Sequence, residues 1–360
     1  MERYARIRSA MLREGFDALL LTEEYNRFYA TGFPSPGTDG LCLIKKDKAY
    51  YFTDERYTVA AKRAVKEAEI GIISRDKGYI ALTNEVIRRE NIQVLGFDEQ
   101  NMTVAAYERY KKQLDCELLG CSELMNRLRL TKDEEEVRRL KKAQRISEQA
   151  LAEVLPYIRA GVTEKEIAAK LEYFMLLHGA EKMSFDPIVV SGENGAMPHG
   201  VPGDKQIRSG EFVTMDFGCV AEGYCSDMTR TVAVGFVTEE MRQVYDTVLK
   251  AQQAGIAATR AGVSAKSVDL AARKVISDAG YGPHFSHSYG HGVGVEIHEK
   301  PNVSPANETL LPVGAVTSAE PGIYIPGKFG ARIEDVVVVT EDGCIDLAEA
   351  PKELLVLPEK

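Results

Sequence analysis

The sequence predicts an α+β protein with two domains, and two observations carry the prediction. In the first third of the chain, short β-branched runs alternate with helix-period segments, which is typical of a layered α/β domain. In the remainder, two pairs of helix-period segments are each followed by runs with strand character. A chain of 360 residues is long enough for two hydrophobic cores. We place the boundary near residues 122–129 and assign residues 1–125 and 126–360 to the two domains.

The N-terminal domain is predicted as an alternation of helices and strands. The helices are expected at residues 1–14, 26–29, 54–67, 77–90 and 103–113. The strands are expected at residues 17–22, 41–44, 49–52, 70–73 and 93–97. No group of catalytic residue types gathers in this part of the sequence, so we expect the chemistry to lie in the second domain.

The C-terminal domain opens with two predicted helices that begin at capping boxes. One is Thr131–Glu134, before a helix that ends at Gly161, and the other is Thr163–Glu166, before a helix that runs to Gly179. A second helix pair is expected at residues 239–260 and 265–279. Because each pair is followed by strands, the pattern indicates an internal duplication of an α/β half.

An acidic hairpin is the centre of the second domain. Its predicted strands are Phe212–Gly218 and Tyr224–Thr231. With the hairpin axis between Ala221 and Glu222, Asp216 would lie opposite Asp227. Opposed side chains are only about 4.5–5.5 Å apart and like charges repel, so bound divalent cations would explain the pair. The alternative is a solvated hairpin with two exposed acids.

Further ligand types follow in glycine-rich or strand settings. His291 lies in Gly290–Glu299, Glu320 precedes Pro321, and Glu334 lies in a predicted strand at residues 332–339 that places Arg332 on the same face. Four carboxylates and one imidazole are ligands that suit Mn²⁺, Co²⁺ or Zn²⁺ rather than soft metals.

These motifs resemble a known family. The order Asp, Asp, His, Glu, Glu in the settings MDFG, CSDMTRT, GHGVG, AEPGIY and RIED is similar to that of the pita-bread (creatinase/prolidase-fold) metallopeptidases. The closest branch is the proline-specific one, the Xaa-Pro aminopeptidases and Xaa-Pro dipeptidases. The resemblance is close over residues 130–360 and looser over residues 1–125. It implies a C-terminal pita-bread domain preceded by a smaller layered α/β domain.

The resemblance also implies a metal set. It implies two divalent ions per subunit, Mn²⁺ or Co²⁺ with Zn²⁺ possible. Asp227 and Glu334 would bridge the ions, Asp216 would bind one ion, and His291 and Glu320 would bind the other. A hydroxide between the ions would attack the carbonyl that precedes proline.

Four further residues take helper roles by the same resemblance. His199 and His298 would contact the substrate and stabilise the oxyanion, and His287 and Arg332 would line the pocket and orient the ligands. Glu320 would in addition carry a proton to the leaving imino nitrogen. The expected partners are Xaa-Pro dipeptides or short peptides and a second copy of the chain in a homodimer.

Composition excludes several other classes. The formal net charge of −9 argues against a nucleic-acid surface, which needs a basic patch. No apolar run approaches the roughly 20 residues of a membrane span, and Met1–Arg6 resembles an amphipathic helix rather than a signal peptide. The cysteines form no Cys-x-x-Cys pair, which favours free thiols and a cytoplasmic protein.

Features of the sequence bear on several alternative functions. A non-catalytic binding or scaffold protein with the same fold would be expected to have lost some of the five ligands. All five are present in this sequence, which favours an enzyme. The glycines at 290–294 would suit a dinucleotide loop, but residues 295–298 read as a strand and not as a helix. A Gly-x-Ser-x-Gly elbow is absent from the sequence. Dipeptidase and aminopeptidase activity both stay open, because they depend on whether the far end of the pocket is closed.

Overall fold

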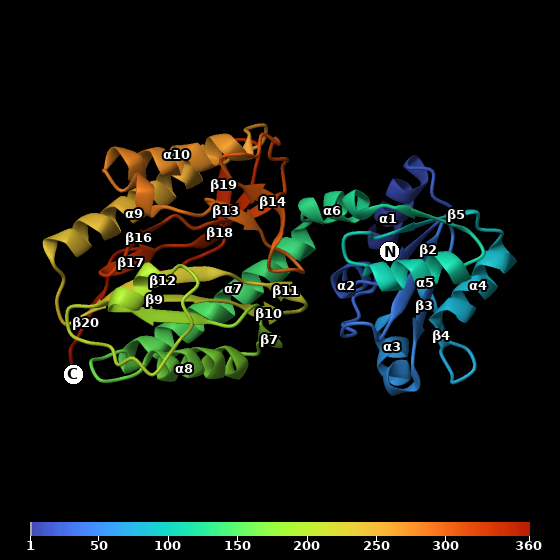
Figure 1. Cartoon of the computed structure of the whole chain (residues 1–360), viewed down its shortest axis with the longest axis horizontal. Coiled ribbons are helices and arrows are strands. Elements are labelled where there is room, and N and C mark those ends of the chain that lie inside the picture. Colours follow the sequence, from blue (N-terminus) through green and yellow to red (C-terminus); the bar gives the residue numbers. More distant parts are fainter. Residues whose placement is uncertain (1) are drawn as a thin grey trace. The chain divides into compact units, whose positions relative to one another are not determined.

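A computed structural model describes residues 2–360. The chain divides into two compact units, Met1–Arg129 and Leu130–Lys360 (Figure 1). The division lies within helix α6 (Ser122–Leu130), and the predicted boundary at 125/126 falls inside the same helix. Within residues 2–360, every helix is too short or too polar to span a bilayer. All six cysteines are free thiols.

The N-terminal unit is a six-stranded mixed sheet with helices on both faces. The strand order is β4-β3-β2-β1-β5-β6. Its strands are β1 (Ala18–Leu21), β2 (Leu41–Lys45), β3 (Ala49–Thr53), β4 (Ala68–Ile72), β5 (Val94–Phe97) and β6 (Glu117–Gly120). Its other helices are α1 (Glu2–Arg13), α2 (Glu24–Thr31), α3 (Thr58–Ala64), α4 (Tyr79–Glu90) and α5 (Val104–Gln113). One apolar cluster joins the sheet to α1, α2, α3 and α6, and another joins it to α4 and α5.

The predicted layered α/β architecture is therefore confirmed, with local differences. The helix predicted at residues 54–67 begins as a short 3₁₀ turn, Glu55–Tyr57, in which the Asp54 side chain accepts from Arg56 N at 2.8 Å, and continues as α3 to Ala64. Strand β6 and helix α6 were not predicted. Strand β6 lacks the apolar pattern of a buried strand, because most of its side chains face solvent at the edge of the sheet.

The C-terminal unit has four long helices and four small sheets. The helices are α7 (Glu134–Val154), α8 (Glu164–Leu177), α9 (Glu239–Ala258) and α10 (Ala265–Asp278). The first group of strands is β7 (Lys182–Met183), β8 (Ile188–Ser191), β9 (Phe212–Phe217), β10 (Cys219–Ala221), β11 (Tyr224–Cys225) and β12 (Met228–Val234). The second group is β13 (Gly290–Gly292), β14 (Glu299–Val303), β15 (Val316–Ala319), β16 (Gly322–Ile325), β17 (Phe329–Arg332), β18 (Asp335–Val339), β19 (Cys344–Asp346) and β20 (Val356–Leu357).

The sheets lie between the two helix pairs. Strands β8, β9, β12 and β20 form one sheet, and β13, β14, β15, β18 and β19 form another. Figure 1 shows α7 and α8 along one side of these sheets and α9 and α10 along the other. A separate apolar cluster underlies each helix pair. The arrangement of two helix pairs, each followed by antiparallel strands, agrees with the predicted pattern of two halves.

The first capping box of this unit differs from the predicted one. Asp133, not Thr131, is the N-cap of α7: its carboxylate accepts from Glu136 N at 2.9 Å, and the Glu136 side chain accepts from Asp133 N at 3.0 Å. Thr131 instead forms a β-bridge with Ala315. The second predicted box, Thr163 with Glu166, is confirmed.

The predicted register of the acidic hairpin is wrong by two residues. Asp216 pairs with Thr229 and not with Asp227. Asp227 lies just before β12, in the break between β11 and β12. Gly218 permits this break, because an added Cβ would clash with the carbonyl oxygen of Ser226, which lies in the break itself.

The turn explains the error. Glu222 and Gly223 both have positive φ, 50° and 75°, as in the type I′ turns that match the twist of hairpin strands. The axis therefore falls between these two residues, not between Ala221 and Glu222. A shift of two residues leaves every side chain on its face, so Asp216 and Asp227 still face the same cavity.

Two other predicted strands are interrupted. The continuous strand expected at residues 332–339 is two strands, β17 and β18, which belong to different sheets. Residues 295–298, predicted as a strand, form a loop before β14. Both segments lie beside the cavity described below. Their side chains line the cavity, and their backbone does not continue a strand.

Candidate active site

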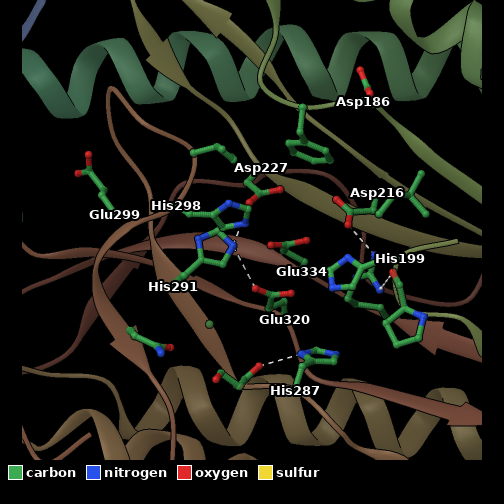
Figure 2. Close-up of a pocket in the computed structure, with 18 residues that line it drawn as sticks. Asp186, His199, Asp216, Asp227, His287, His291, His298, Glu299, Glu320 and Glu334 are labelled. Carbon is green, nitrogen blue, oxygen red and sulfur yellow. Dashed lines mark hydrogen bonds and ion pairs between the residues drawn. The ribbon is translucent and has the colours of Figure 1, made fainter. Parts of the chain in front are cut away.

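One cavity of about 590 Å³ brings together all the predicted site residues. Figure 2 shows their side chains converging on it. The predicted residues that line it are Asp216, Asp227, His291, Glu320, Glu334, His199, His298, His287 and Arg332. Other lining residues include Phe185, Ile188 and Asn302, to which the sequence analysis assigned no role.

The five predicted ligands come from two of the four sheets of the unit. Asp216 lies on β9 and Asp227 directly precedes β12, so both belong to the first sheet. His291 lies on β13, Glu320 directly follows β15, and Glu334 directly precedes β18 of the second sheet. The site therefore forms only where the two halves of the unit meet.

Three of these side chains offer ligand atoms that converge. Asp227, His291 and Glu334 each have one such atom within 4.8 Å of the others. His291 Nε2 lies 3.5 Å from Asp227 Oδ2 and 3.3 Å from Glu320 Oε1. His291 Nδ1 lies 3.1 Å from the carbonyl of Gly292, which can only accept, so Nδ1 carries the proton. The lone pair of Nε2 is thereby directed at the carboxylates.

Burial makes the negative charge of this group costly. Burial, followed by repulsion from Asp216, raises the pKa of Asp227 well above its usual range. Burial also raises the pKa of Glu320 to about 7, and burial together with Asp227 raises the pKa of Glu334 well above normal. Burial lowers the pKa of His291, which favours the neutral ring. The cluster thus has an excess of negative charge that a cation would relieve.

Asp216 provides a further sign of a missing positive partner. Its Oδ2 accepts from Arg332 Nη2 at 2.5 Å, whereas its Oδ1 is buried and has no hydrogen-bond partner within residues 2–360. Buried polar atoms almost always have partners. Hard oxygen donors, one imidazole and an unpartnered carboxylate oxygen fit divalent metal ions.

Arg332 and His287 are joined by a residue that the sequence analysis missed. The Tyr324 hydroxyl accepts from Arg332 Nη1 at 2.8 Å and lies 2.8 Å from His287 Nε2. Because His287 Nδ1 faces the Ser288 carbonyl at 2.8 Å, the hydroxyl donates to Nε2. Burial, with a smaller effect of Arg332, lowers the pKa of His287 to about 4, so the ring is neutral. Tyr324 lies in the AEPGIY motif, which had drawn attention only to its glutamate.

Two hydroxyl groups also support predicted ligands. Thr229 Oγ1 donates to Glu334 Oε2 at 2.6 Å and accepts from Arg332 Nε at 3.0 Å. Ser318 Oγ donates to Glu320 Oε1 at 3.0 Å. Thr229 could have been found in the sequence, because it lies two residues from Asp227 and on the same face of the strand.

The remaining two histidines lie at the edge of the ligand group. The rings of His298 and His291 meet edge-to-face with centroids 4.4 Å apart, and burial followed by His291 lowers the pKa of His298. His199 lies on an exposed loop between β8 and β9 and faces the cavity near Asp216 (Figure 2). Both imidazoles are in reach of a molecule in the cavity.

The chain belongs to metallopeptidase family M24. The family model matches residues 138–341, and the model of the Creatinase/Prolidase N-terminal domain matches residues 3–131. The predictions of the family, of the pita-bread fold and of a metal-dependent peptidase are confirmed.

Individual relatives match over nearly the whole chain. The structure of an Xaa-Pro dipeptidase from Bacillus anthracis is 41% identical, with a TM-score of 0.94 and 99% of each chain covered. The structure of an X-Pro aminopeptidase from Thermotoga maritima is 37% identical, with a TM-score of 0.91, and covers 97% of this chain and 100% of its own. An Xaa-Pro dipeptidase from Pyrococcus furiosus is 37% identical over 355 residues, 98% of this chain and 99% of the relative.

Proposed function

We propose that the protein hydrolyses the peptide bond between an N-terminal residue and proline, with two divalent metal ions held in the cavity. The observation that carries the proposal is the convergence of four carboxylates and one imidazole, among which the buried Asp216 Oδ1 has no hydrogen-bond partner in residues 2–360. The names of relatives with 37–41% identity support the choice of substrate.

The metal ions are assigned to the five ligand residues. Asp227 and Glu334 are proposed to bridge the ions, with Asp216 on one ion and His291 and Glu320 on the other. When bound, the ions activate water and polarise the scissile carbonyl. Mn²⁺ and Co²⁺ are the proposed ions, and the same donors accept Zn²⁺.

The surrounding side chains are assigned to the substrate. His199 and His298 line the cavity on either side of the ligand group and are proposed to hydrogen-bond the carbonyl oxygen as negative charge develops on it. Glu320 faces the cavity from its position beside His291 and is proposed to pass a proton to the leaving imino nitrogen. Arg332 and His287, joined by Tyr324, orient Asp216 and form the wall of the cavity.

Proline at the second position is proposed to be recognised by its shape. Its ring nitrogen has no hydrogen to donate, so the apolar side chains Phe185 and Ile188 at the cavity wall are suited to the ring. The dipeptidase relatives favour dipeptides as substrates, and the likeness to an aminopeptidase supports longer Xaa-Pro peptides as a second candidate.

The proposal is tested on purified protein with a peptide panel. Chelator-treated protein should be inactive, and Mn²⁺ or Co²⁺ should restore hydrolysis of Ala-Pro. Replacing proline with alanine, or acetylating the N-terminus, should lower kcat/KM strongly. Equal rates on Ala-Ala and Ala-Pro would indicate a general peptidase, and full turnover by demonstrably metal-free protein would end the metallopeptidase mechanism.

Substrate length is resolved in the same panel. Rates on Ala-Pro and on Ala-Pro-Ala, measured at equal concentrations of metal-loaded protein, distinguish a dipeptidase from an aminopeptidase. A dipeptidase should cleave Ala-Pro and leave the tripeptide nearly intact, whereas an aminopeptidase should release alanine from the tripeptide.

A further inference from the structure

The loop that carries His199 is organised by a buried carboxylate outside the cavity. The loop runs from Ser191 at the end of β8 to Gly203. Glu164, the first residue of α8, is completely buried, and its carboxylate accepts from Ser191 N at 2.7 Å, Ser191 Oγ at 2.9 Å, and Gly203 N at 3.3 Å. Asn194 Nδ2 lies 3.1 Å from each carboxylate oxygen. One carboxylate thus ties the start, the middle and the end of the loop.

The hydrogen bonds to the Glu164 carboxylate hold the loop and do not cap helix α8. The N-terminus of α8 is already capped by Thr163 and Glu166, whose side chain accepts from Thr163 N at 2.8 Å. Every donor to the Glu164 carboxylate named above belongs to the loop. A carboxylate without hydrogen bonds would be costly to bury, so Glu164 and the loop stabilise each other.

The opposite side of the loop lies against the active site. Gly195 packs so closely on Gly330 of β17 that a Cβ on Gly330 would clash with the Gly195 carbonyl oxygen. The Pro198 carbonyl accepts from Arg332 Nη1 at 3.3 Å, and Arg332 also binds Asp216. The residue next to Pro198 is His199. The loop is therefore held between Glu164 and the group of residues that surrounds the predicted metal ligands.

His199 depends on this loop for its position. In the part of the chain that the structure describes, its imidazole has no hydrogen-bond partner, and the residue is exposed at the cavity. The backbone conformation of residues 191–203 is then the main determinant of where the ring lies.

We propose that Glu164 is a positioning residue for His199, acting by fixing the loop and not by touching substrate or metal. The inference rests on the proposed function only in assuming that His199 contacts the substrate. Loss of the carboxylate should release the loop and displace the imidazole, and displacements of about 1 Å can lower rates by on the order of 10²-fold.

A double-mutant cycle tests the proposal. Glu164→Gln should lower kcat on Ala-Pro by on the order of 10- to 100-fold and leave the bound metal, measured by elemental analysis, at the wild-type level. In a His199→Ala background the same substitution should change kcat by no more than about twofold, because non-additivity marks residues that act through one another. Glu166→Gln is the matched control, since it changes the same helix terminus but not the loop, and it should keep wild-type kcat.

A second readout does not depend on peptidase activity. Lys205 lies two residues after Gly203, and its Nζ donates to Ser191 Oγ at 2.8 Å and to Glu211 Oε2 at 2.7 Å. Limited trypsin cleavage after Lys205 should be faster in Glu164→Gln than in the wild type or in Glu166→Gln. If Glu164→Gln does not fold, Asn194→Ala removes only the hydrogen bonds from the middle of the loop to Glu164. This variant should also show a lower kcat and faster trypsin cleavage, with smaller changes than those expected for Glu164→Gln.

The outcomes separate the two hypotheses. A wild-type protein that cleaves no Xaa-Pro peptide would refute the proposed function, while the trypsin experiment would still report on the loop. Unchanged kcat and unchanged cleavage in Glu164→Gln, or a loss of kcat that is equally large in the His199→Ala background, would overturn the role of Glu164.

Discussion

The two carboxylate oxygens of Asp216 have different partners: Oδ2 accepts from Arg332 Nη2 at 2.5 Å, and Oδ1 is buried with none in the described residues. The guanidinium therefore fixes the orientation of the carboxylate and leaves one oxygen directed at the cavity. Arg332 is itself fixed by Thr229 and Tyr324. This arrangement makes the arginine a determinant of ligand geometry rather than a simple counter-ion.

We expect Arg332→Lys to lower kcat/KM on Ala-Pro by about 10- to 100-fold, the usual cost of losing an outer partner of a metal ligand. Lysine keeps the charge but cannot reproduce the planar set of donors that reaches Asp216, Thr229 and Tyr324. Steady-state kinetics beside circular dichroism would check this. Arg138→Lys, at an exposed position on α7, is the control and should be neutral. Wild-type kinetics in Arg332→Lys would show that charge alone suffices.

Histidine substitutions should separate metal ligands from substrate contacts. His291→Ala should lose roughly one equivalent of metal and most of the activity. His298→Ala and His199→Ala should keep near-normal metal content but lose on the order of 10²–10³-fold in kcat, as expected for one donor to a developing oxyanion. Elemental analysis and kinetics on each variant give the two readouts.

The control for that series is His178→Ala, since His178 pairs with Glu153 at the surface and does not line the cavity. A site emptied by His298→Ala but not by His291→Ala would reverse the two assignments. Unchanged rates in all three variants would place the reaction elsewhere.

His287 should contribute to the dependence of stability on pH. Its pKa is about 4 in the folded protein, against 6.5 for a histidine in the unfolded chain, so between these values the unfolded chain binds more protons. The contribution of His287 to the free energy of unfolding is therefore complete above about pH 6.5. As the pH falls towards about 4, that free energy should decrease by up to roughly 3 kcal/mol. Urea unfolding of chelator-treated protein should show a shallower decline over this range for His287→Gln than for the wild type. Parallel curves would contradict the prediction, and His178→Gln provides the comparison.

The hairpin turn should be sensitive to a methyl group at one glycine. Gly223 has a φ of 75°, a conformation that costs residues with a Cβ about 1–2 kcal/mol. Gly223→Ala should therefore lower the free energy of unfolding by about that amount. Gly343→Ala, where the φ is not in the left-handed region and an added Cβ meets nothing within 4 Å, is the control. Equal stability of the two variants would contradict the assigned turn.

Much of the protein could be predicted from the sequence because the signals are local. Period and capping residues predicted α8, α9 and α10 closely, and the glycine at 179 follows the end of α8 with a positive φ. The five ligand types in their motifs also indicated a metallopeptidase, which the family match confirms. Local chemistry of this kind is visible in a few neighbouring residues.

Other features were not predicted from the sequence. The hairpin register was set by positive φ at Glu222, which a sequence pattern does not reveal. Tyr324 became part of the site because β16 pairs with β17, which carries Arg332, and because folding brings the distant His287 to its hydroxyl.

The sequence by itself thus determined the elements and the kinds of ligand. Tertiary structure alone decided which side chains share one cavity. It also decided that Arg332 binds only one carboxylate oxygen of Asp216, and that Glu164 forms hydrogen bonds with the loop that carries His199. The physical reason is that propensity and periodicity act over a few residues, whereas burial, charge pairing and hydrogen bonding depend on segments that meet only in the folded chain.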